Sequence, residues 1–128
     1  MPVRSLNSPV LKWPDAKMVV QALKSWAETV TRERPEVVRI GFFGSYARGD
    51  WGVGSDLDLI IIVTDSRQPF ELRPSGFNTL ELPVPTDLLV YTQEEWQAMK
   101  PARRYFQELD REASWVYTRN IILQEAST

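Results

Sequence analysis

The chain has 128 residues, of which 43% are apolar and 25% are charged, and this composition excludes disordered and collagen-like chains. Its 17 acidic and 15 basic residues give a formal net charge of -2, so it lacks the strongly basic balance that is typical of nucleic-acid binders. The sequence contains no cysteine and no histidine, which excludes disulfides, thiolate metal sites and histidine bases. Any chemistry must use carboxylates, hydroxyls, amines or guanidinium groups.

The length favours one domain over residues 1–128, with the first 14 or so residues as an extended arm. A chain of this size buries roughly two-thirds of the surface that its unfolded form exposes, so it can form a core without staples. The longest aliphatic run, residues 59–63, is too short to span a bilayer, and no apolar leader is visible near the N-terminus. We therefore expect a soluble cytoplasmic protein.

The first half of the chain predicts one helix and two strands. Apolar residues recur every three or four positions over 15–32, which indicates an amphipathic helix with Asp15 as its N-cap. Pro35 breaks this pattern, and the β-branched and aromatic run 37–43 predicts a strand that ends at Gly44. Residues 57–63, LDLIIIV, predict a second strand that is central and buried on both faces.

The second half is less regular. Residues 64–78 contain proline, glycine and charge without a period, and predict a long loop, while 79–82 favour a short strand. A third strand is predicted at 86–92, followed by a helix that Thr92 and Glu95 begin as a capping box and that runs to about residue 109. Pro101 should divide that helix in two. Residues 114–119 favour a last strand.

Two aspartates at the start of the second strand carry the first chemical signal. Asp56 and Asp58 are two residues apart, so in a regular strand their carboxylates point to the same face. Adjacent carboxylates raise each other's pKa unless a cation lies between them. Mg²⁺ prefers hard oxygen ligands of this kind, together with substrate phosphates and water.

The preceding strand ends in Gly44-Ser45, a tight turn that can present backbone N–H groups and a hydroxyl to an anion. A phosphate-binding turn beside metal-binding acids would set a triphosphate next to its metal ions, as phosphoryl chemistry requires. Asp87, at the start of the third strand, is the candidate third acid that would allow two ions to bind. Taken singly, these residues also fit an ordinary turn and solvated strand ends, and Arg48 fits a surface ion pair; their joint order favours the functional interpretation.

At these residues the sequence resembles the nucleotidyltransferase superfamily related to DNA polymerase beta, in particular its minimal nucleotidyltransferase (MNT) branch. The segment GSYARGD (44–50) is similar to the family's Gly-Ser-x-Ala-Arg-Gly segment, and GSDLDL (54–59) to its Ser-Asp-x-Asp-Leu segment. Asp87 in TDLLVY matches its third acid on a later strand. The elements around these motifs extend the resemblance, more weakly, over residues 15–119.

The resemblance implies an α+β fold, a mixed β-sheet flanked by α-helices. It implies that Asp56, Asp58 and Asp87 are the catalytic acids and hold two Mg²⁺ ions, with Mn²⁺ as an alternative. Gly44 and Ser45 would hold the nucleotide's phosphates, and the matched motifs add Arg48 and Ser55 to the nucleotide-binding set. The implied reaction transfers a nucleoside monophosphate, AMP from ATP, to an acceptor hydroxyl and releases pyrophosphate.

Members of the short branch are often encoded beside a helical HEPN protein, and some are thought to neutralise that toxin by attaching AMP to it. Because the sequence continues only briefly beyond the third acid, we expect the acceptor to dock from outside or across a homodimer, with a HEPN-type protein as the partner. The first alternative is a catalytically silent antitoxin that acts by binding alone. The second is an antibiotic-modifying nucleotidyltransferase, and a nucleic-acid-binding module ranks last because the acids would repel phosphates.

Overall fold

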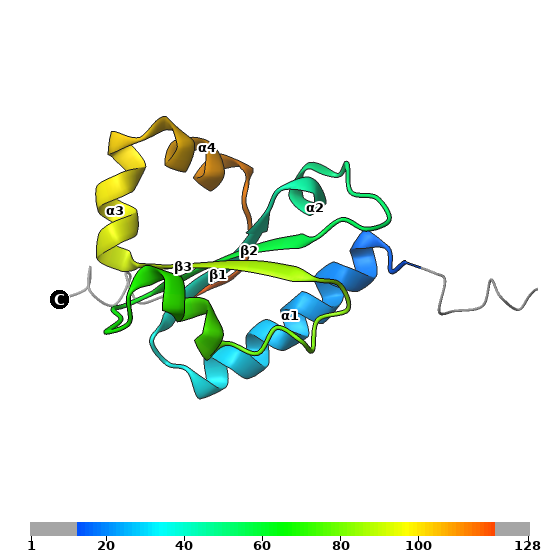
Figure 1. Cartoon of the computed structure of the whole chain (residues 1–128), viewed down its shortest axis with the longest axis horizontal. Coiled ribbons are helices and arrows are strands. Elements are labelled where there is room, and N and C mark those ends of the chain that lie inside the picture. Colours follow the sequence, from blue (N-terminus) through cyan, green and yellow to red (C-terminus); the bar gives the residue numbers. More distant parts are fainter. Residues whose placement is uncertain (1–12, 120–128) are drawn as a thin grey trace, which may run out of the picture.

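Four strands form one mixed sheet in the order β3-β2-β1-β4 in the computed structural model, which describes residues 13–119 (Figure 1). The strands are β1 (Val37–Phe43), β2 (Leu57–Val63), β3 (Thr86–Thr92) and β4 (Ser114–Thr118). Strand β1 pairs antiparallel with both β2 and β4, whereas β2 and β3 are parallel. The predicted mixed sheet and the central position of β2 are therefore confirmed.

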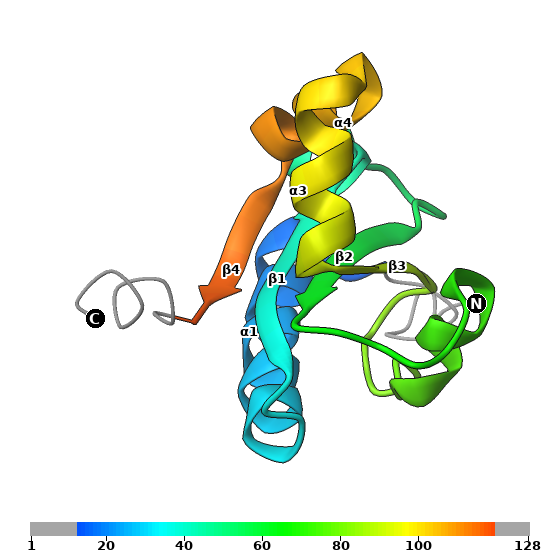
Figure 2. The ribbon, with the colours of Figure 1, turned by 90° about the vertical axis from the view of Figure 1, so that its left-hand side faces the viewer.

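Helices cover both faces of this sheet. Helix α1 (Ala16–Glu33) lies on one face, and α3 (Gln93–Ala102) and α4 (Arg104–Glu112) lie on the other (Figure 1). The short helix α2 (Ser45–Arg48) follows β1 directly. Figure 2 shows β4 at one edge of the sheet, reached from the end of α4. The architecture is α+β with three layers over much of the sheet.

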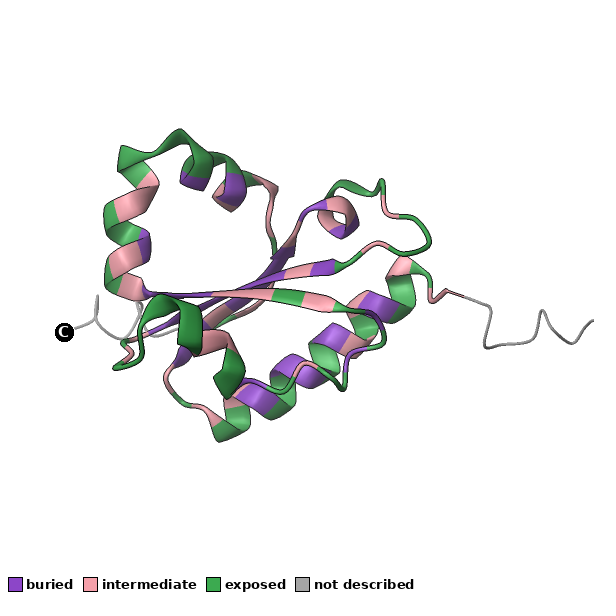
Figure 3. Cartoon of the chain, in the orientation of Figure 1, coloured by how far each residue is buried: buried purple, intermediate pink, exposed green. Residues whose placement is uncertain are grey.

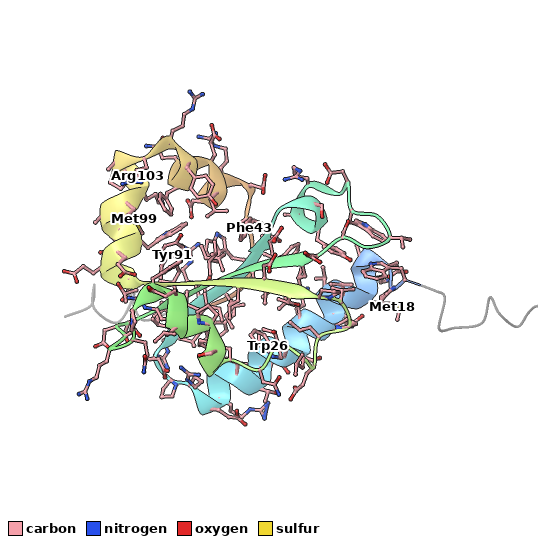
Figure 4. The ribbon with its side chains drawn as sticks, viewed as in Figure 1. Met18, Trp26, Phe43, Tyr91, Met99 and Arg103 are labelled. Atoms are coloured by element: carbon pink, nitrogen blue, oxygen red, sulfur yellow. The ribbon has the colours of Figure 1, made fainter. Side chains whose placement is uncertain are left out.

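Helix α1 forms because its apolar positions recur with the helical period. Its buried residues form the stripe that faces the sheet in Figure 3, and they are Val19, Leu23, Trp26, Ala27 and Val30. Asp15 caps the helix as predicted, since its carboxylate accepts a hydrogen bond from the Met18 N–H at 2.9 Å. Trp26, labelled in Figure 4, donates its indole N–H to the Asn78 carbonyl at 2.8 Å, so α1 also anchors the chain that leads into β3.

Strand β2 is buried on both faces because its two sets of alternating side chains enter different cores. Leu57, Leu59, Ile61 and Val63 pack in the cluster that contains α1. Ile60 and Ile62 pack on the opposite face with an aromatic cluster from β3, α3 and α4, made of Tyr91, Trp96 and Phe106, together with Leu109. Figure 4 shows Tyr91 between the sheet and α3. The two cores together fix which residues of β2 point to each face.

Three sequence predictions fare differently here. The capping box of Thr92 and Glu95 is present, and the predicted helix is divided into α3 and α4 after Ala102. The predicted strand at 79–82 is wrong: these residues form turns and bends, since Pro83 and Pro85 follow at once and cannot donate to a ladder.

The predicted loop at 64–78 contains a 3-10 helix, η2 (Phe70–Gly76). Arg73 of η2 anchors it by donating to Glu95 at 2.7 Å and to the Val90 carbonyl at 3.1 Å. The predicted extended arm at the N-terminus lies almost entirely outside the described residues. Among residues 13–119, no helix is both long and apolar enough to cross a membrane.

Candidate functional site

The candidate site lies where β1 ends and where β2 and β3 begin. The strand register places Phe43 opposite Asp58, and Asp58 opposite Asp87. Neighbouring strands are about 4.8 Å apart, so these three residues form one row across the sheet. The pairing between strands thus brings Asp58 beside Asp87, although 29 positions separate them in the sequence.

The alternation of side chains places the acids on the face that carries α4. Ile60 and Ile62 point toward α3 and α4, and Asp58 shares their face because it is two residues before Ile60. Asp87 precedes Leu89 and Tyr91, which lie in the same cluster, so it shares the face as well. Asp56 lies just before β2 begins and lines the same cavity as Asp58.

The turn after β1 depends on glycine at position 44. Gly44 has φ 75° and ψ -151°, a conformation that residues with a side chain rarely adopt. A Cβ atom at this position would also collide with the Asp58 carboxylate. Glycine therefore allows the backbone N–H of residue 44 to come close to the acids, and Ser45 follows as the first residue of α2.

That N–H already binds an anion within the molecule. The Gly44 N–H donates to a carboxylate oxygen (Oε2) of Glu112, the last residue of α4, at 2.7 Å. The other oxygen of the same carboxylate lies 3.5 Å from Arg48, and Arg48 also donates to Asp50 at 3.1 Å. The hydrogen bond that Arg48 donates to Asp50 is the main reason that the pKa of Arg48 is raised above its usual value. The turn and Arg48 are thus arranged to hold an anion.

A cavity of about 460 Å³ opens over these groups. Residues from β1, α2 and the start of β2 line one side of it, and residues from α4 line the other; they are Phe43, Gly44, Ser45, Arg48, Asp56, Asp58, Tyr105, Glu108, Leu109 and Glu112. Figure 4 shows Phe43 between α4 and α2. Four carboxylates and one guanidinium in a single cavity indicate a site for a charged ligand.

The ionisation of Asp58 in this cavity is disturbed by its surroundings. Its pKa is raised, first because the carboxyl is partly buried and then because Asp87 and Asp56 carry the same charge nearby. Arg48 opposes this rise, and Glu112 adds to it. Negative charge here therefore exceeds what the nearby guanidinium can balance, and a cation would relieve the repulsion.

Asp56, Asp58 and Asp87 are suitable ligands for Mg²⁺ in kind, because they offer hard carboxylate oxygens. Their mutual repulsion at Asp58 is what a cation would remove. Within residues 13–119, however, no group of three or more acidic side chains is already arranged to hold a metal ion. The donors fit the ion, and the chain would have to draw them together around it.

Of the predicted acids, Asp87 lies beside Asp58 in the sheet but does not line the cavity. Two further differences from the predicted site concern Ser55 and α4. The Ser55 hydroxyl accepts a hydrogen bond from the Gly52 N–H at 2.8 Å, so here it stabilises its own turn and does not line the cavity. Sequence reasoning missed Tyr105, Glu108 and Glu112, which form the second wall. Their only sequence signal is the amphipathic pattern of residues 104–112, which does not reveal what the polar face opposes.

A second cavity, of about 440 Å³, opens between η2 and the far end of β2. Arg34, Arg67 and Arg73 line it, and two of these three already have partners: Arg34 donates to Glu36 at 2.7 Å and to the Gly76 carbonyl at 2.6 Å, and Arg73 pairs with Glu95. The paired aspartates lie at the opposite end of β2. The cavity under α4 is therefore the better candidate for chemistry.

The fold and the paired acids indicate a nucleotidyltransferase, and comparison with known proteins supports the same class. The family described as "nucleotidyltransferase domain" matches residues 23–114, well over half of the chain. The chain belongs to this family, whose members generally use divalent metal ions. No curated protein matches the chain.

Two solved structures share the fold. One is a protein from Sulfolobus solfataricus assigned as a nucleotidyltransferase, with a TM-score of 0.60, 19% identity, and coverage of 81% of this chain and 84% of that one. The other is a toxin-antitoxin structure with AMP-PNP, with a TM-score of 0.52, 18% identity, and coverage of 76% of this chain and 74% of that one. At these identities the likeness concerns the fold alone.

Proposed function

We propose that this protein transfers AMP from ATP to a hydroxyl group of a partner protein, in a Mg²⁺-dependent reaction, and that the partner is a HEPN-type toxin. The observation that carries the proposal is the placement of Asp58 and Asp87 side by side on the face that the Gly44 N–H and Arg48 also border. A nucleotidyltransferase needs both parts, acids for metal and donors for phosphate, within the length of one triphosphate.

In this proposal each group of the chain has one task. The Gly44 N–H, the Ser45 hydroxyl and Arg48 bind oxygens of the phosphates, and Asp56, Asp58 and Asp87 hold the metal ions. When bound, Mg²⁺ supplies charge neutralisation for the leaving pyrophosphate and lowers the pKa of the acceptor hydroxyl. The acceptor oxygen forms a bond to the α-phosphorus, the bond from that phosphorus to the bridging oxygen breaks, and pyrophosphate leaves with its electron pair. The hydroxyl proton passes to solvent.

The protein partner is supported by the fold. The toxin-antitoxin structure with AMP-PNP resembles this chain over about three-quarters of both chains, and a nucleotide analogue is part of that structure. A partner protein would supply the acceptor at the mouth of the cavity, beside Tyr105, whose side chain is largely exposed on α4.

A binding-only antitoxin is the second candidate. It is favoured by the Glu112 carboxylate on the Gly44 N–H and by the lack, within the described part of the chain, of acids already gathered for a metal. A protein in this state could bind its partner without any nucleotide. The two candidates differ in one measurable property, transfer of label.

The test incubates the protein with Mg²⁺, the product of the gene next to its own, and ATP labelled at either the α or the γ phosphate. Label on the partner from the α position alone, lost in Asp58→Asn, is the expected result. Label from the γ position would mean a kinase and would overturn the proposal. Absence of transfer, with unchanged binding of the partner by Asp58→Asn, would favour the binding-only antitoxin.

A further inference from the structure

The Glu112 carboxylate holds both of the anion-binding groups in the site. One of its oxygens accepts the Gly44 N–H at 2.7 Å, and the other lies 3.5 Å from Arg48. A phosphate would bind there in the same way, with one oxygen on the Gly44 N–H and another on Arg48. In this structure the side chain thus stands in the place that the proposed function assigns to a phosphate.

The sheet brings the backbones of Glu112 and Gly44 close together, and the Glu112 side chain then makes the contact. Ser114 pairs with Phe42 in the antiparallel ladder of β1 and β4. Glu112 is two residues before Ser114, and Gly44 is two residues after Phe42, so both lie just beyond the last pair of the ladder, and its antiparallel direction leads the two chains past each other at these positions. The backbone next to Glu112 is also held, because the Ala113 N–H donates to the Leu109 carbonyl at 2.9 Å. Rotation of the side chain alone would therefore release Gly44 and Arg48.

A carboxylate at this position conflicts with a bound triphosphate. It takes the donors that the phosphates need, and it adds negative charge to a cavity that already contains Asp56 and Asp58. We infer that Glu112 is an internal competitor for the nucleotide's phosphates, which occupies their place in the free protein and must turn away before a nucleotide binds. This inference rests on the proposed function and names a residue that sets the nucleotide affinity of that site.

Glu108 offers a matched comparison within the same cavity. It lies one turn earlier on α4 and lines the same wall, but its carboxylate accepts from Arg104 at 3.0 Å in an i,i+4 pair. Its charge is near the site, whereas its hydrogen bonds are elsewhere. Neutralising Glu108 therefore changes the electrostatic field in the cavity without releasing Gly44 or Arg48.

The test measures binding by calorimetry in Mg²⁺ with α,β-methylene ATP, inorganic tripolyphosphate and adenosine as separate probes. A charge-assisted hydrogen bond that must break lowers the apparent affinity of the competing ligand by about tenfold. We expect Glu112→Gln to bind both triphosphates about tenfold more tightly than the wild type, while adenosine binding is unchanged. Glu108→Gln, which removes a charge from the cavity but releases no donor, should bind the triphosphates only slightly more tightly than the wild type, well short of tenfold, and should bind adenosine like the wild type. Circular dichroism melting checks that each variant is folded.

The inference is overturned if Glu112→Gln binds the triphosphates no more tightly than the wild type, or if Glu108→Gln gives the same gain, which would indicate a general effect of charge. The inference is also overturned if neither the wild type nor either variant binds a triphosphate, because the cavity would then have no phosphate position for Glu112 to occupy. AMP transfer without tighter binding by Glu112→Gln would leave the proposed function standing and refute the competitor. Tighter tripolyphosphate binding by Glu112→Gln without any AMP transfer would support the competitor and refute the proposed function.

Discussion

Replacing Asp58 with asparagine should stabilise the protein when no divalent metal is present. The pKa of Asp58 is raised in the folded protein by burial and by the charges of Asp87 and Asp56, so folding disfavours its ionised form. For a carboxyl with a raised pKa, the free energy of unfolding falls as the pH rises through that folded pKa. Above it, the wild type carries an unfavourable charge that Asp58→Asn lacks.

The size of the effect follows from the register. Asp58 and Asp87 are partners on neighbouring strands, whose backbones are about 5 Å apart, and parallel side chains keep their charges at about the same separation. Coulomb's law gives about 1 kcal/mol for two unit charges at that separation in a water-like environment, which applies because the cavity is open and Asp58 is only partly buried. For a chain of this length, 1 kcal/mol corresponds to a rise in Tm of about 4 °C.

The assay is thermal unfolding by circular dichroism at pH 7 with a chelator, repeated near pH 4 and with Mg²⁺. Asp58→Asn should melt higher than the wild type at pH 7, and the gap should close towards pH about 4 as Asp58 takes up its proton. Mg²⁺ should raise the Tm of the wild type more than that of the variant. Asp65→Asn, an exposed acid beyond the other end of β2, is the control and should change nothing. A lower Tm for Asp58→Asn in chelator, or equal stabilisation of both proteins by Mg²⁺, would refute this reasoning.

Two further predictions concern glycines that the fold requires. Gly44→Ala should lose nucleotide binding and about 1–2 kcal/mol of stability, because it meets both a positive φ and the Asp58 carboxylate; Gly49→Ala, which has a positive φ but open space, should lose stability while nucleotide calorimetry stays near the wild type. Gly41→Ala should loosen β4, because its Cβ would lie 2.7 Å from the Trp115 ring. Relative to the wild type, amide hydrogen exchange should become faster in residues 114–118 and change less in β2. Exchange in residues 114–118 at the wild-type rate would contradict this prediction.

The local elements could be predicted because each has a local cause. Helix α1 follows from its apolar period and its Asp15 cap, and α3 from the Thr92 capping box. Strand β2 follows from a short aliphatic run rich in β-branched residues, which is typical of a strand that is buried on both faces. The predicted strand at 79–82 failed because the pattern of apolar residues carries no information about whether a partner strand is available. Leu82 is buried, but Pro83 and Pro85 after it have no backbone N–H to donate, so the segment does not pair with a strand.

The candidate site could be predicted only in part, and the reason is register. The motif residues Gly44, Asp56 and Asp58 lie close together in the sequence, so their proximity follows from one turn and one strand. The side-by-side placement of Asp58 and Asp87 depends on the parallel pairing of β2 with β3, which no local pattern specifies. The position of Glu112 depends on the pairing of β1 with β4, and the residue belongs to no motif, so no sequence pattern places it beside Gly44.

The strand register that brings the acids together also explains how the fold tolerates the repulsion between them. The row of Phe43, Asp58 and Asp87 is the last row of these three strands before the chain turns away, and Ile60 and Ile62 follow on the same face with essentially no exposure. Apolar burial of one such side chain contributes about 1.5–3 kcal/mol, against about 1 kcal/mol for the repulsion between the acids. Moving the acids two residues inward would place them under α3 and α4, where the cost of desolvation rises to several kcal/mol per ion. The end of the sheet is thus the position at which repelling carboxylates are held firmly by their strands while still reaching water and a cation.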